Sequence, residues 1–380
     1  MKAVLAWLFS NLPVFIAVFI LLGASVLSSG CYTLKQGTIM LGYLSRAVPL
    51  EELGKGAEQS GADRLFAKRA GDIRRFAMEE LGLEESKNYT RYVELDRDYL
   101  AAVVSASAKD SFSRYQWWFP VVGRVPYKGF FNVKDARKER VKLEKKDLDV
   151  WVRGVDAFST LGWFRDPLYS YMKEYSDQYL AELIIHELLH ATVYINNHSQ
   201  FNEGLAEFVG IEGGRLYMEK IRSIENENTQ SVVEAQSVEN KNIQADRAVY
   251  LTFIRGLIDE LDGLYKSVMP REEKLSRKEE IINSAKASFD ENYDGLFLTG
   301  NYRFFSGLPV NNAYLELFRL YHEEDHYFED LYERSGRDLL KFINAAKTLG
   351  SRFKQGQGSR RLDKGNWDPR EELEKALGLR

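Results

Sequence analysis

The chain has 380 residues, of which 44% are hydrophobic and 28% are charged, so it is long and apolar enough to bury a large core. Its formal net charge of −4 excludes the strongly basic surface that nucleic-acid-binding proteins need. Its single cysteine excludes a framework of intramolecular disulfide bonds.

Residues 1–30 have the pattern of a signal peptide that ends in a bacterial lipobox. Met1 and Lys2 precede a mostly apolar run over residues 3–27, and small residues then lead to Cys31. We expect cleavage before Cys31 and lipidation of that residue, which would export the protein to the cell envelope. Tyr32 follows the cysteine where an aspartate would retain a lipoprotein in the inner membrane, so we expect the outer membrane, facing the periplasm. An uncleaved single membrane span is the alternative, because the apolar run is long enough.

Residues 31–350 are expected to form one domain. The apolar and charged periodicities predict helices over residues 36–44, 63–83 and 135–148, and strands over residues 92–108 and 150–158. The aromatic segment 117–131 is punctuated by Pro and Gly residues, which favours a hairpin or a bent pair of strands.

A helix over residues 178–195, with Ser176 as its N-cap, is apolar on most sides and carries His186-Glu187-Leu188-Leu189-His190. Residues four apart lie on one face of a helix, so His186 and His190 can bind the same metal ion. Glu187 lies one position further round, close enough to act as general base on a water bound to that metal. This HExxH spacing is typical of zinc sites with two imidazoles, a third protein ligand and an open position, so we expect one Zn²⁺ per chain.

The third ligand is expected on a second helix that returns past the first. Residues 196–199 end the first helix and turn the chain, which would bring Glu203 back to the metal. Glu207, one turn further on, would then accept the second ring N–H of a ligand histidine. Glu207 itself, Glu212 and His198 are competitors for the ligand position.

The stretch Ala157-Phe158-Ser159-Thr160-Leu161-Gly162 lies just upstream of the metal-binding helix. In zinc peptidases an edge strand beside this helix binds the substrate backbone by β-augmentation, so Ser159, Thr160, Leu161 and Gly162 are candidate substrate contacts. An ordinary core strand and turn is the alternative.

The rest of the chain is expected to be helical. Residues 213–300 would form a helical insertion, with residues 225–241 as a hairpin tip or a loosely ordered segment. Asn312, Tyr314 and Tyr321 are candidates for substrate contacts or an oxyanion donor, against the simpler interpretation of a capped helix with an aromatic core face. His322 and His326 repeat the HExxH spacing among acidic residues and are expected on a solvated face. Residues 351–380 are expected to be a flexible, charged tail.

Several longer strings resemble those of a known family. Asn202-Glu203-Gly204-Leu205-Ala206 is similar to the NExxA segment that supplies the glutamate ligand in gluzincin metallopeptidases, which favours Glu203 as the third ligand and Asn202 as its supporting neighbour. Residues 117–131 (WWFPVVGRVPYKGFF) and 154–167 (GVDAFSTLGWFRDP), with matching segments at 32–49, 73–83 and 308–321, resemble the bacterial family of predicted zinc aminopeptidases, which are membrane-anchored. Members of that family often carry cysteines where this chain has Trp118 and Arg124.

The resemblance implies an α+β, predominantly helical, zincin-like fold with a small mixed sheet packed on the HExxH helix. It also implies zinc-dependent hydrolysis of a peptide or protein substrate, most simply as an aminopeptidase. Two alternatives stay open: an endopeptidase of narrow specificity, and a lipid-anchored zinc-binding scaffold without catalytic activity.

Overall fold

The computed structural model describes residues 32–53, 55, 61–119, 123–157, 165–224, 230–358 and 367–380, with backbone alone at 230–237, 239–240 and 355–358. Cys31, the expected signal peptide and Ser159–Gly162 lie outside the described residues. The chain divides into two units, Met1–Ala47 and Val48–Arg380. The described part of the first unit is a helix over residues 32–46, which agrees with the helix expected there.

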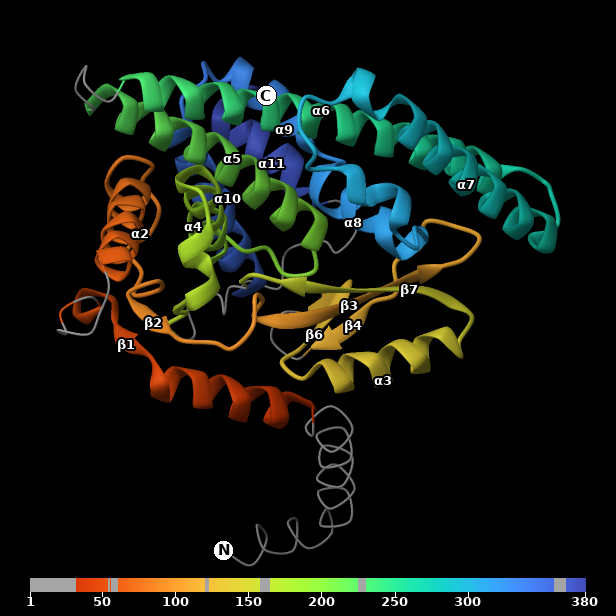
Figure 1. The fold of residues 1–380 in the computed structure, drawn as a ribbon, viewed down its shortest axis with the longest axis horizontal. Helices are drawn as coiled ribbons and strands as arrows, with labels where there is room; N and C mark the ends of the chain where they lie inside the picture. Colours follow the sequence, from red (N-terminus) through yellow and green to blue (C-terminus); the bar gives the residue numbers. More distant parts are fainter. Residues whose placement is uncertain are drawn as a thin grey trace, which may run out of the picture. The chain divides into compact units, whose positions relative to one another are not determined.

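The second unit contains a three-stranded antiparallel sheet in the order β6-β3-β7. The central strand β3 (Ala101–Ala108) pairs with β6 (Tyr127–Phe130) and with β7 (Leu148–Val155), so β7 forms one edge. Strand β3 is buried almost throughout because α3 (Val133–Glu144) and α8 (Asn312–His322) both pack against the sheet. Figure 1 shows α3 below this sheet and α8 above it.

Two smaller sheets complete the β structure. The hairpin β4–β5 (Trp117–Phe119 and Gly123–Val125) confirms the expected strand pair. In the other sheet, β2 (Arg91–Val93) pairs with β1 (Val48–Pro49) and runs parallel to β8 (Leu168–Tyr169). The single strand expected over residues 92–108 is therefore wrong: β2 and β3 belong to different sheets, and the polar segment 94–100 connects them.

The helical layer is built around α4 (Asp177–Thr192) and α5 (Ser199–Ile224), which pack closely together. Helix α2 (Gly61–Glu79) packs on α4, while α9 (Asp325–Arg334) and α10 (Leu339–Gly358) pack on α5. We expected a small mixed sheet to pack on the HExxH helix, but the main partners of α4 are helices, because it is apolar on most sides. Two helices, α3 and α8, pack on the antiparallel sheet, and α8 is the one that lines the cleft described below. The fold is α+β and mostly helical, as expected.

Helices α6 (Gln230–Lys266) and α7 (Arg271–Leu296) form a long antiparallel pair. They share a hydrophobic cluster with the short 3₁₀ helix η4 (Arg303–Gly307) and with α8. We expected a helical insertion to begin at residue 213, but α5 continues without a break through that position to Ile224. Of the segment 225–241, expected as a hairpin tip or a loosely ordered stretch, residues 230–241 belong to helix α6 and residues 225–229 lie outside the described residues. The turn between α6 and α7 lies at residues 267–270.

The C-terminal segment differs from the flexible tail that we expected. Helix α10 continues to Gly358, and α11 (Pro369–Leu377) packs on it. The Asp368 side chain caps α11 by accepting from the Arg370 N–H at 2.9 Å, and Leu373 and Leu377 are buried. The i, i+4 spacing of these two leucines between charged residues was the signal for a helix. The remaining short elements are the 3₁₀ helices η1 (Leu50–Glu52) and η2 (Ser170–Glu174).

The close contact between α4 and α5 depends on glycines of α5. A Cβ atom at Gly210 would lie 2.9 Å from the Glu182 carbonyl oxygen and 3.2 Å from the His186 Cβ atom. A Cβ atom at Gly214 would lie 2.6 Å from the Glu182 Cγ atom. Only glycine permits this approach of one helix backbone to the other.

We predict that Gly210→Ala destabilises the protein by about 1–3 kcal/mol, because the methyl group forces α5 away from α4. The matched control is Gly256→Ala on α6, where a Cβ atom meets nothing within 4 Å. That change should stabilise the protein by about 0.5–1 kcal/mol, because alanine loses less backbone entropy than glycine when the helix forms. Urea unfolding of both variants measures the difference; an equal stabilisation in both would contradict the role assigned to Gly210.

Candidate metal centre

Helix α4 begins at Asp177, directly after the expected N-cap Ser176, and ends at Thr192 rather than at the expected residue 195. The Ser176 hydroxyl accepts from the Tyr179 N–H at 3.2 Å and caps the helix, and Asp177 follows in the first turn. His186 and His190 project from the same face, and their Nε2 atoms lie 3.1 Å apart. The spacing of the two histidines on one helix is therefore enough to bring their ring nitrogens together.

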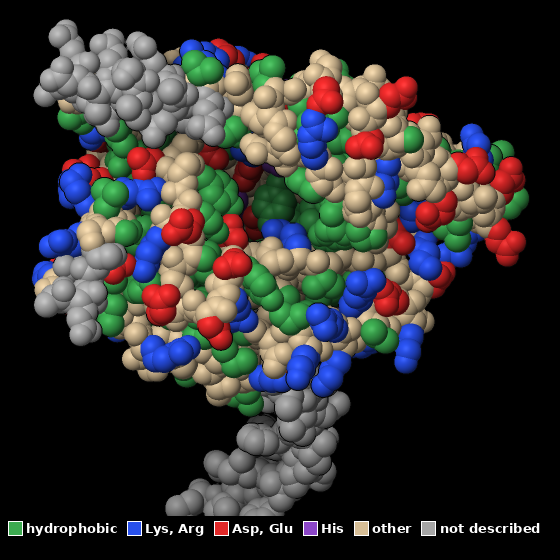
Figure 2. All heavy atoms as spheres, viewed as in Figure 1, with side chains coloured by type: hydrophobic (Ala, Val, Ile, Leu, Met, Phe, Trp, Pro, Cys, Tyr) green, Lys and Arg blue, Asp and Glu red, His purple; other side chains and the backbone are tan. Residues whose placement is uncertain are grey.

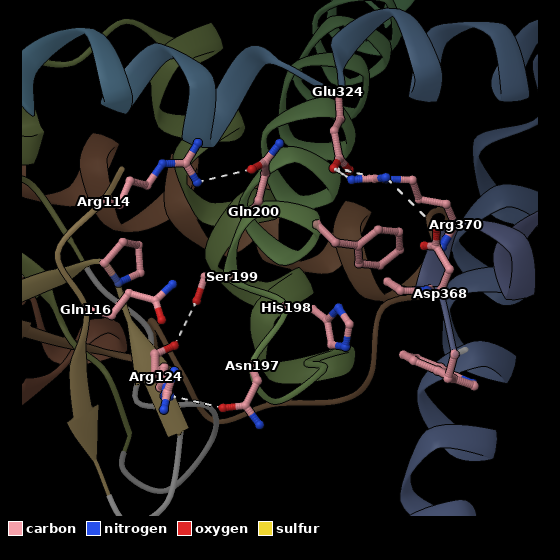
Figure 3. Close-up of a pocket in the computed structure, with 14 residues that line it drawn as sticks. Arg114, Gln116, Arg124, Asn197, His198, Ser199, Gln200, Glu324, Asp368 and Arg370 are labelled. Atoms are coloured by element: carbon pink, nitrogen blue, oxygen red, sulfur yellow. Dashed lines mark hydrogen bonds and ion pairs between the residues drawn. The ribbon is translucent and has the colours of Figure 1, made fainter. Parts of the chain in front are cut away.

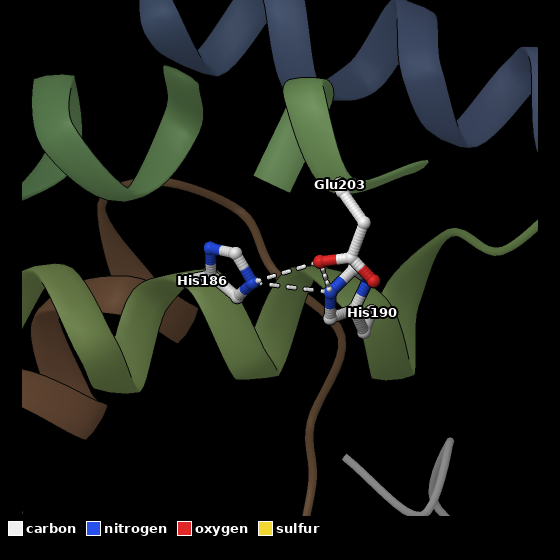
Figure 4. A group of neighbouring side chains, drawn as sticks. All are labelled: His186, His190 and Glu203. Carbon is white, nitrogen blue, oxygen red and sulfur yellow. Dashed lines mark hydrogen bonds and ion pairs between the residues drawn. The ribbon is translucent and has the colours of Figure 1, made fainter. Parts of the chain in front are cut away.

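The turn after α4 brings α5 back to these histidines. The Asn202 side chain accepts from the Ile195 N–H at 2.9 Å and donates to the Ile195 carbonyl at 2.8 Å, which ties the start of α5 to the end of the turn. Glu203 follows, and its Oε2 atom lies 3.7 Å from His186 Nε2 and 3.5 Å from His190 Nε2. Figure 4 shows the three side chains pointing toward one another from α4 and α5. Asn202 thus supports Glu203 through the backbone.

The spacing of these three atoms fits a divalent metal ion. Ligand atoms about 2.1 Å from a tetrahedral zinc ion lie about 3.4 Å from one another. The three observed separations, 3.1, 3.5 and 3.7 Å, bracket that value. Two imidazoles and one carboxylate also form a donor set that zinc prefers, with one position left open.

Buried charge around His186 favours a cation at this point. Burial lowers the pKa of His186, but the neighbouring carboxylates of Glu203 and Glu207 outweigh it and raise the pKa to about 10. For Glu203, burial raises the pKa, but the two histidines outweigh this effect and lower the pKa to well below its usual range. The carboxylates therefore stabilise positive charge between them, whether it is a proton or a metal ion.

Glu207 lies behind His186, away from the position between the two Nε2 atoms. Its Oε2 atom is 3.5 Å from His186 Nδ1, which orients that N–H and leaves the Nε2 lone pair for the metal. Glu207 also pairs with Arg247 of α6. This geometry fits the supporting role expected for Glu207. The competitor Glu212 pairs with Arg215 at 2.9 Å and is not part of the metal-binding group.

Glu187 is buried and faces a cleft of about 720 Å³ that His186 also lines. The cleft is lined by residues of α4, α5 and α6 and by residues of β7, η4 and α8. Figure 2 shows this hollow, with hydrophobic side chains along one side and acidic side chains gathered on the other. The metal-binding group therefore has access to a cavity large enough for part of a peptide.

Tyr127 of β6 is a residue of the centre that we did not identify from the sequence. Its hydroxyl donates to Glu203 Oε1 at 3.0 Å, which leaves Oε2 directed at the histidines. Burial and the Glu203 carboxylate raise the pKa of Tyr127 well above its usual value, so the hydroxyl keeps its proton. The two residues are 76 positions apart, and no local pattern links them.

Tyr321 of α8 lines the cleft beside Glu187. Arg153 of β7 donates to the Tyr321 hydroxyl oxygen at 3.3 Å. A guanidinium can only donate, so the Tyr321 proton is free to be donated elsewhere. Burial and nearby carboxylates raise the pKa of Tyr321 above its usual value, so the phenol remains a donor.

The other candidates at the end of the chain lie in different surroundings. Tyr314 lines the cleft, but its hydroxyl is 2.6 Å from the Tyr250 hydroxyl. Asn312 does not fit the expected substrate contact: it is fully buried, its amide donates to the carbonyls of Ala108, Lys109 and Ser111, and its oxygen accepts from Tyr265. It ties α8 to the end of β3.

His322 and His326 also differ from expectation. Helix α8 ends at His322, so the two histidines do not lie on one continuous helix. The His326 side chain is 78% exposed, as a solvated face requires, but that of His322 is 14% exposed and lines the cleft. Its Nδ1 atom lies 3.1 Å from Asp325 Oδ2. His322 continues the face of α8 that carries Tyr314 and Phe318, both of which also line the cleft, and the helix break separates His326 from that face.

His198, the remaining competitor for the metal, lies in a second pocket of about 420 Å³ (Figure 3). Its ring packs edge-on against Trp367 and Phe353 rather than facing the other histidines. Among the described residues, the group that can hold a metal ion is His186, His190 and Glu203. In the same pocket the Asn197 side chain accepts from the Arg124 N–H at 3.1 Å, which fixes hairpin β4–β5 to the turn between α4 and α5.

Comparison with known proteins supports the resemblance seen in the sequence. The chain matches a family model described as "Putative aminopeptidase" over residues 31–361. Since the match spans most of the chain, the protein belongs to this family, whose description indicates peptide hydrolysis. No curated protein and no solved structure matches the chain. Among the residues that the structure describes, no helix has the length and apolarity needed to cross a membrane.

We predict that Tyr127→Phe weakens zinc binding by about 10- to 100-fold, because Glu203 loses the donor that orients it. The matched control is Tyr265→Phe, which removes another buried hydroxyl, 2.8 Å from the Asn312 oxygen, outside the centre. Competition with a fluorescent chelator measures both affinities. Equal affinities in the two variants would show that Tyr127 does not support the metal ligand.

Proposed function

We propose that the protein is a zinc-dependent peptidase of gluzincin type with a zincin-like arrangement, and that it acts as an aminopeptidase. The observation that carries the proposal is the convergence of His186, His190 and Glu203 at ligand spacing, beside an intact Glu187 and an open cleft. The family assignment supports peptide hydrolysis and, by its description, an amino-terminal specificity.

In the proposed hydrolysis, the metal ligands, Glu187 and Tyr321 have separate roles. His186, His190 and Glu203 would hold one zinc ion, which supplies a Lewis acid that polarises a carbonyl and acidifies water. Glu187 takes a proton from the attacking water and delivers it to the amine that leaves. The Tyr321 hydroxyl donates a hydrogen bond to the oxygen that gains negative charge as the carbonyl is attacked. Glu187 is buried and lines the same cleft as the ligand His186.

A zinc-binding scaffold without activity is the second candidate. It would need the three ligands, but neither a base at position 187 nor a cleft beside it. The presence of both favours the enzyme. An endopeptidase of narrow specificity would use the same centre and differs only in whether the cleft recognises a free amino terminus.

We predict that Glu187→Gln protein retains zinc but that its kcat falls by about 10²- to 10⁴-fold, because the glutamine amide cannot accept the proton of the attacking water. Tyr321→Phe should lower kcat by about 10²- to 10³-fold with KM little changed, since its hydrogen bond strengthens only in the transition state. Peptide hydrolysis and bound zinc are measured on the same preparations. Full turnover by Glu187→Gln protein would refute this mechanism.

We also propose that the protein is a lipoprotein of the cell envelope, oriented toward the periplasm and anchored through Cys31. The supporting observation is the lipobox-like sequence that ends at this residue, which lies outside the described part of the chain. Labelled palmitate should be incorporated into the wild type and not into Cys31→Ser protein. Incorporation into neither would favour the uncleaved membrane span.

A further inference from the structure

The cleft beside the metal centre has two chemically different sides. On one side, Glu182 of α4 and Glu207 of α5 present carboxylates close to His186. On the other side, η4 and α8 present Phe304 and Leu317. Both sides face the same cavity that reaches Glu187, so a bound molecule meets both at once.

The apolar side is a face of the hydrophobic cluster shared by α6, α7, η4 and α8. Tyr314 belongs to that cluster, and Phe318 packs against it, yet both also line the cleft. Phe304 also lines the cleft and is 53% exposed, although it is a large aromatic residue. An apolar face that is left open next to a reactive centre is suited to an apolar part of a ligand.

The acidic side holds two carboxylates near one guanidinium group. Glu182 lies one helical turn before His186, about 6 Å along the axis of α4. Its Oε1 atom accepts from the Gln178 amide at 2.9 Å, and Arg247 lies 3.9 Å from Oε2, at the limit of an ion pair. The same Arg247 pairs more closely with Glu207, so two carboxylates share one guanidinium. Burial raises the pKa of Glu182 to about 7, and the Gln178 amide and Arg247 offset this rise only in part.

We propose that this cleft binds the amino-terminal residue of a peptide that begins with a bulky apolar residue. The α-ammonium group lies against Glu182, and the side chain lies on the wall formed by Phe304 and Leu317. In such a peptide the ammonium group and the side chain are both bonded to the Cα atom next to the carbonyl carbon, and they point away from each other. When that carbonyl lies at the metal centre, one group can therefore reach the acidic side of the cleft and the other the apolar side. This inference rests on the proposed peptidase function and specifies its substrate class.

The test measures binding rather than turnover. Full-length Glu187→Gln protein is titrated by calorimetry with peptides that differ only in the first residue (Phe, Ala or Glu) and with an N-acetylated Phe peptide. We expect the Phe peptide to bind about 10- to 100-fold more tightly than the Ala peptide, because the wall buries the larger side chain. N-acetylation should weaken binding by at least about 10-fold, because the charge that Glu182 accepts is removed.

Variants of the two sides separate the contributions. In the Glu187→Gln background, Phe304→Ala and Leu317→Ala should reduce the preference for Phe over Ala, and Glu182→Gln should remove the preference for a free amine. Leu317→Lys should shift the preference toward the Glu peptide. The matched control is Leu298→Ala, which truncates a side chain that is 66% exposed and does not line the cleft.

Equal binding of free and acetylated peptides, or of Phe and Ala peptides, would overturn the inference. So would preferences that persist unchanged in the cleft variants. If the wild type hydrolyses internal bonds without an amine preference, the peptidase proposal stands and this inference fails. If nothing is hydrolysed but the binding preferences follow the variants, the recognition site stands and the peptidase proposal fails.

Discussion

The structure depends on the close packing of α4 against α5. The metal-binding histidines belong to one helix and the candidate glutamate ligand to the other, so their separation is set by how closely the two backbones approach. Gly210 and Gly214 leave no Cβ atom in the contact, and the Asn202 side chain ties the intervening turn to Ile195. Tyr127, from the sheet, then holds Glu203 at the angle that directs one oxygen toward the histidines. Rigid elements of the scaffold, rather than loops, thus position the candidate ligands.

The buried carboxylates around His186 explain why this geometry favours a cation. Glu203 and Glu207 are brought into a buried region around His186, while Glu187 borders the same space. Buried carboxylates are costly unless cations compensate them. Arg247 compensates Glu207 in part, and the histidines interact with Glu203. A divalent cation at the Nε2 atoms would complete the balance and would also satisfy the two ring nitrogens that lie 3.1 Å apart. Packing and electrostatics therefore favour the same occupant.

The parts of the centre that could be predicted from the sequence are those fixed by local geometry. The cap at Ser176, the shared face of His186 and His190, and the return of α5 with Glu203 all follow from spacings within about thirty residues of chain. Tyr127, Arg153 and Arg247 reach the centre through the sheet and α6, and no short pattern encodes such contacts. The separation of His326 from His322 depends on a helix break, and the burial of Asn312 depends on where β3 ends. The fold class was predictable for the same reason, and the i, i+4 leucines of α11 were a local signal that we did not use. Which helices cover each sheet could not be predicted from such local patterns.

The most direct test of the account is the zinc content of the purified wild type compared with His186→Ala, Glu203→Ala and His198→Ala proteins. The account predicts one zinc per chain in the wild type and in His198→Ala, and loss of zinc in the other two, because His198 packs against Trp367 in a separate pocket. Zinc that survives Glu203→Ala would move the third ligand elsewhere. A wild-type protein that binds no zinc even after reconstitution would contradict the central claim.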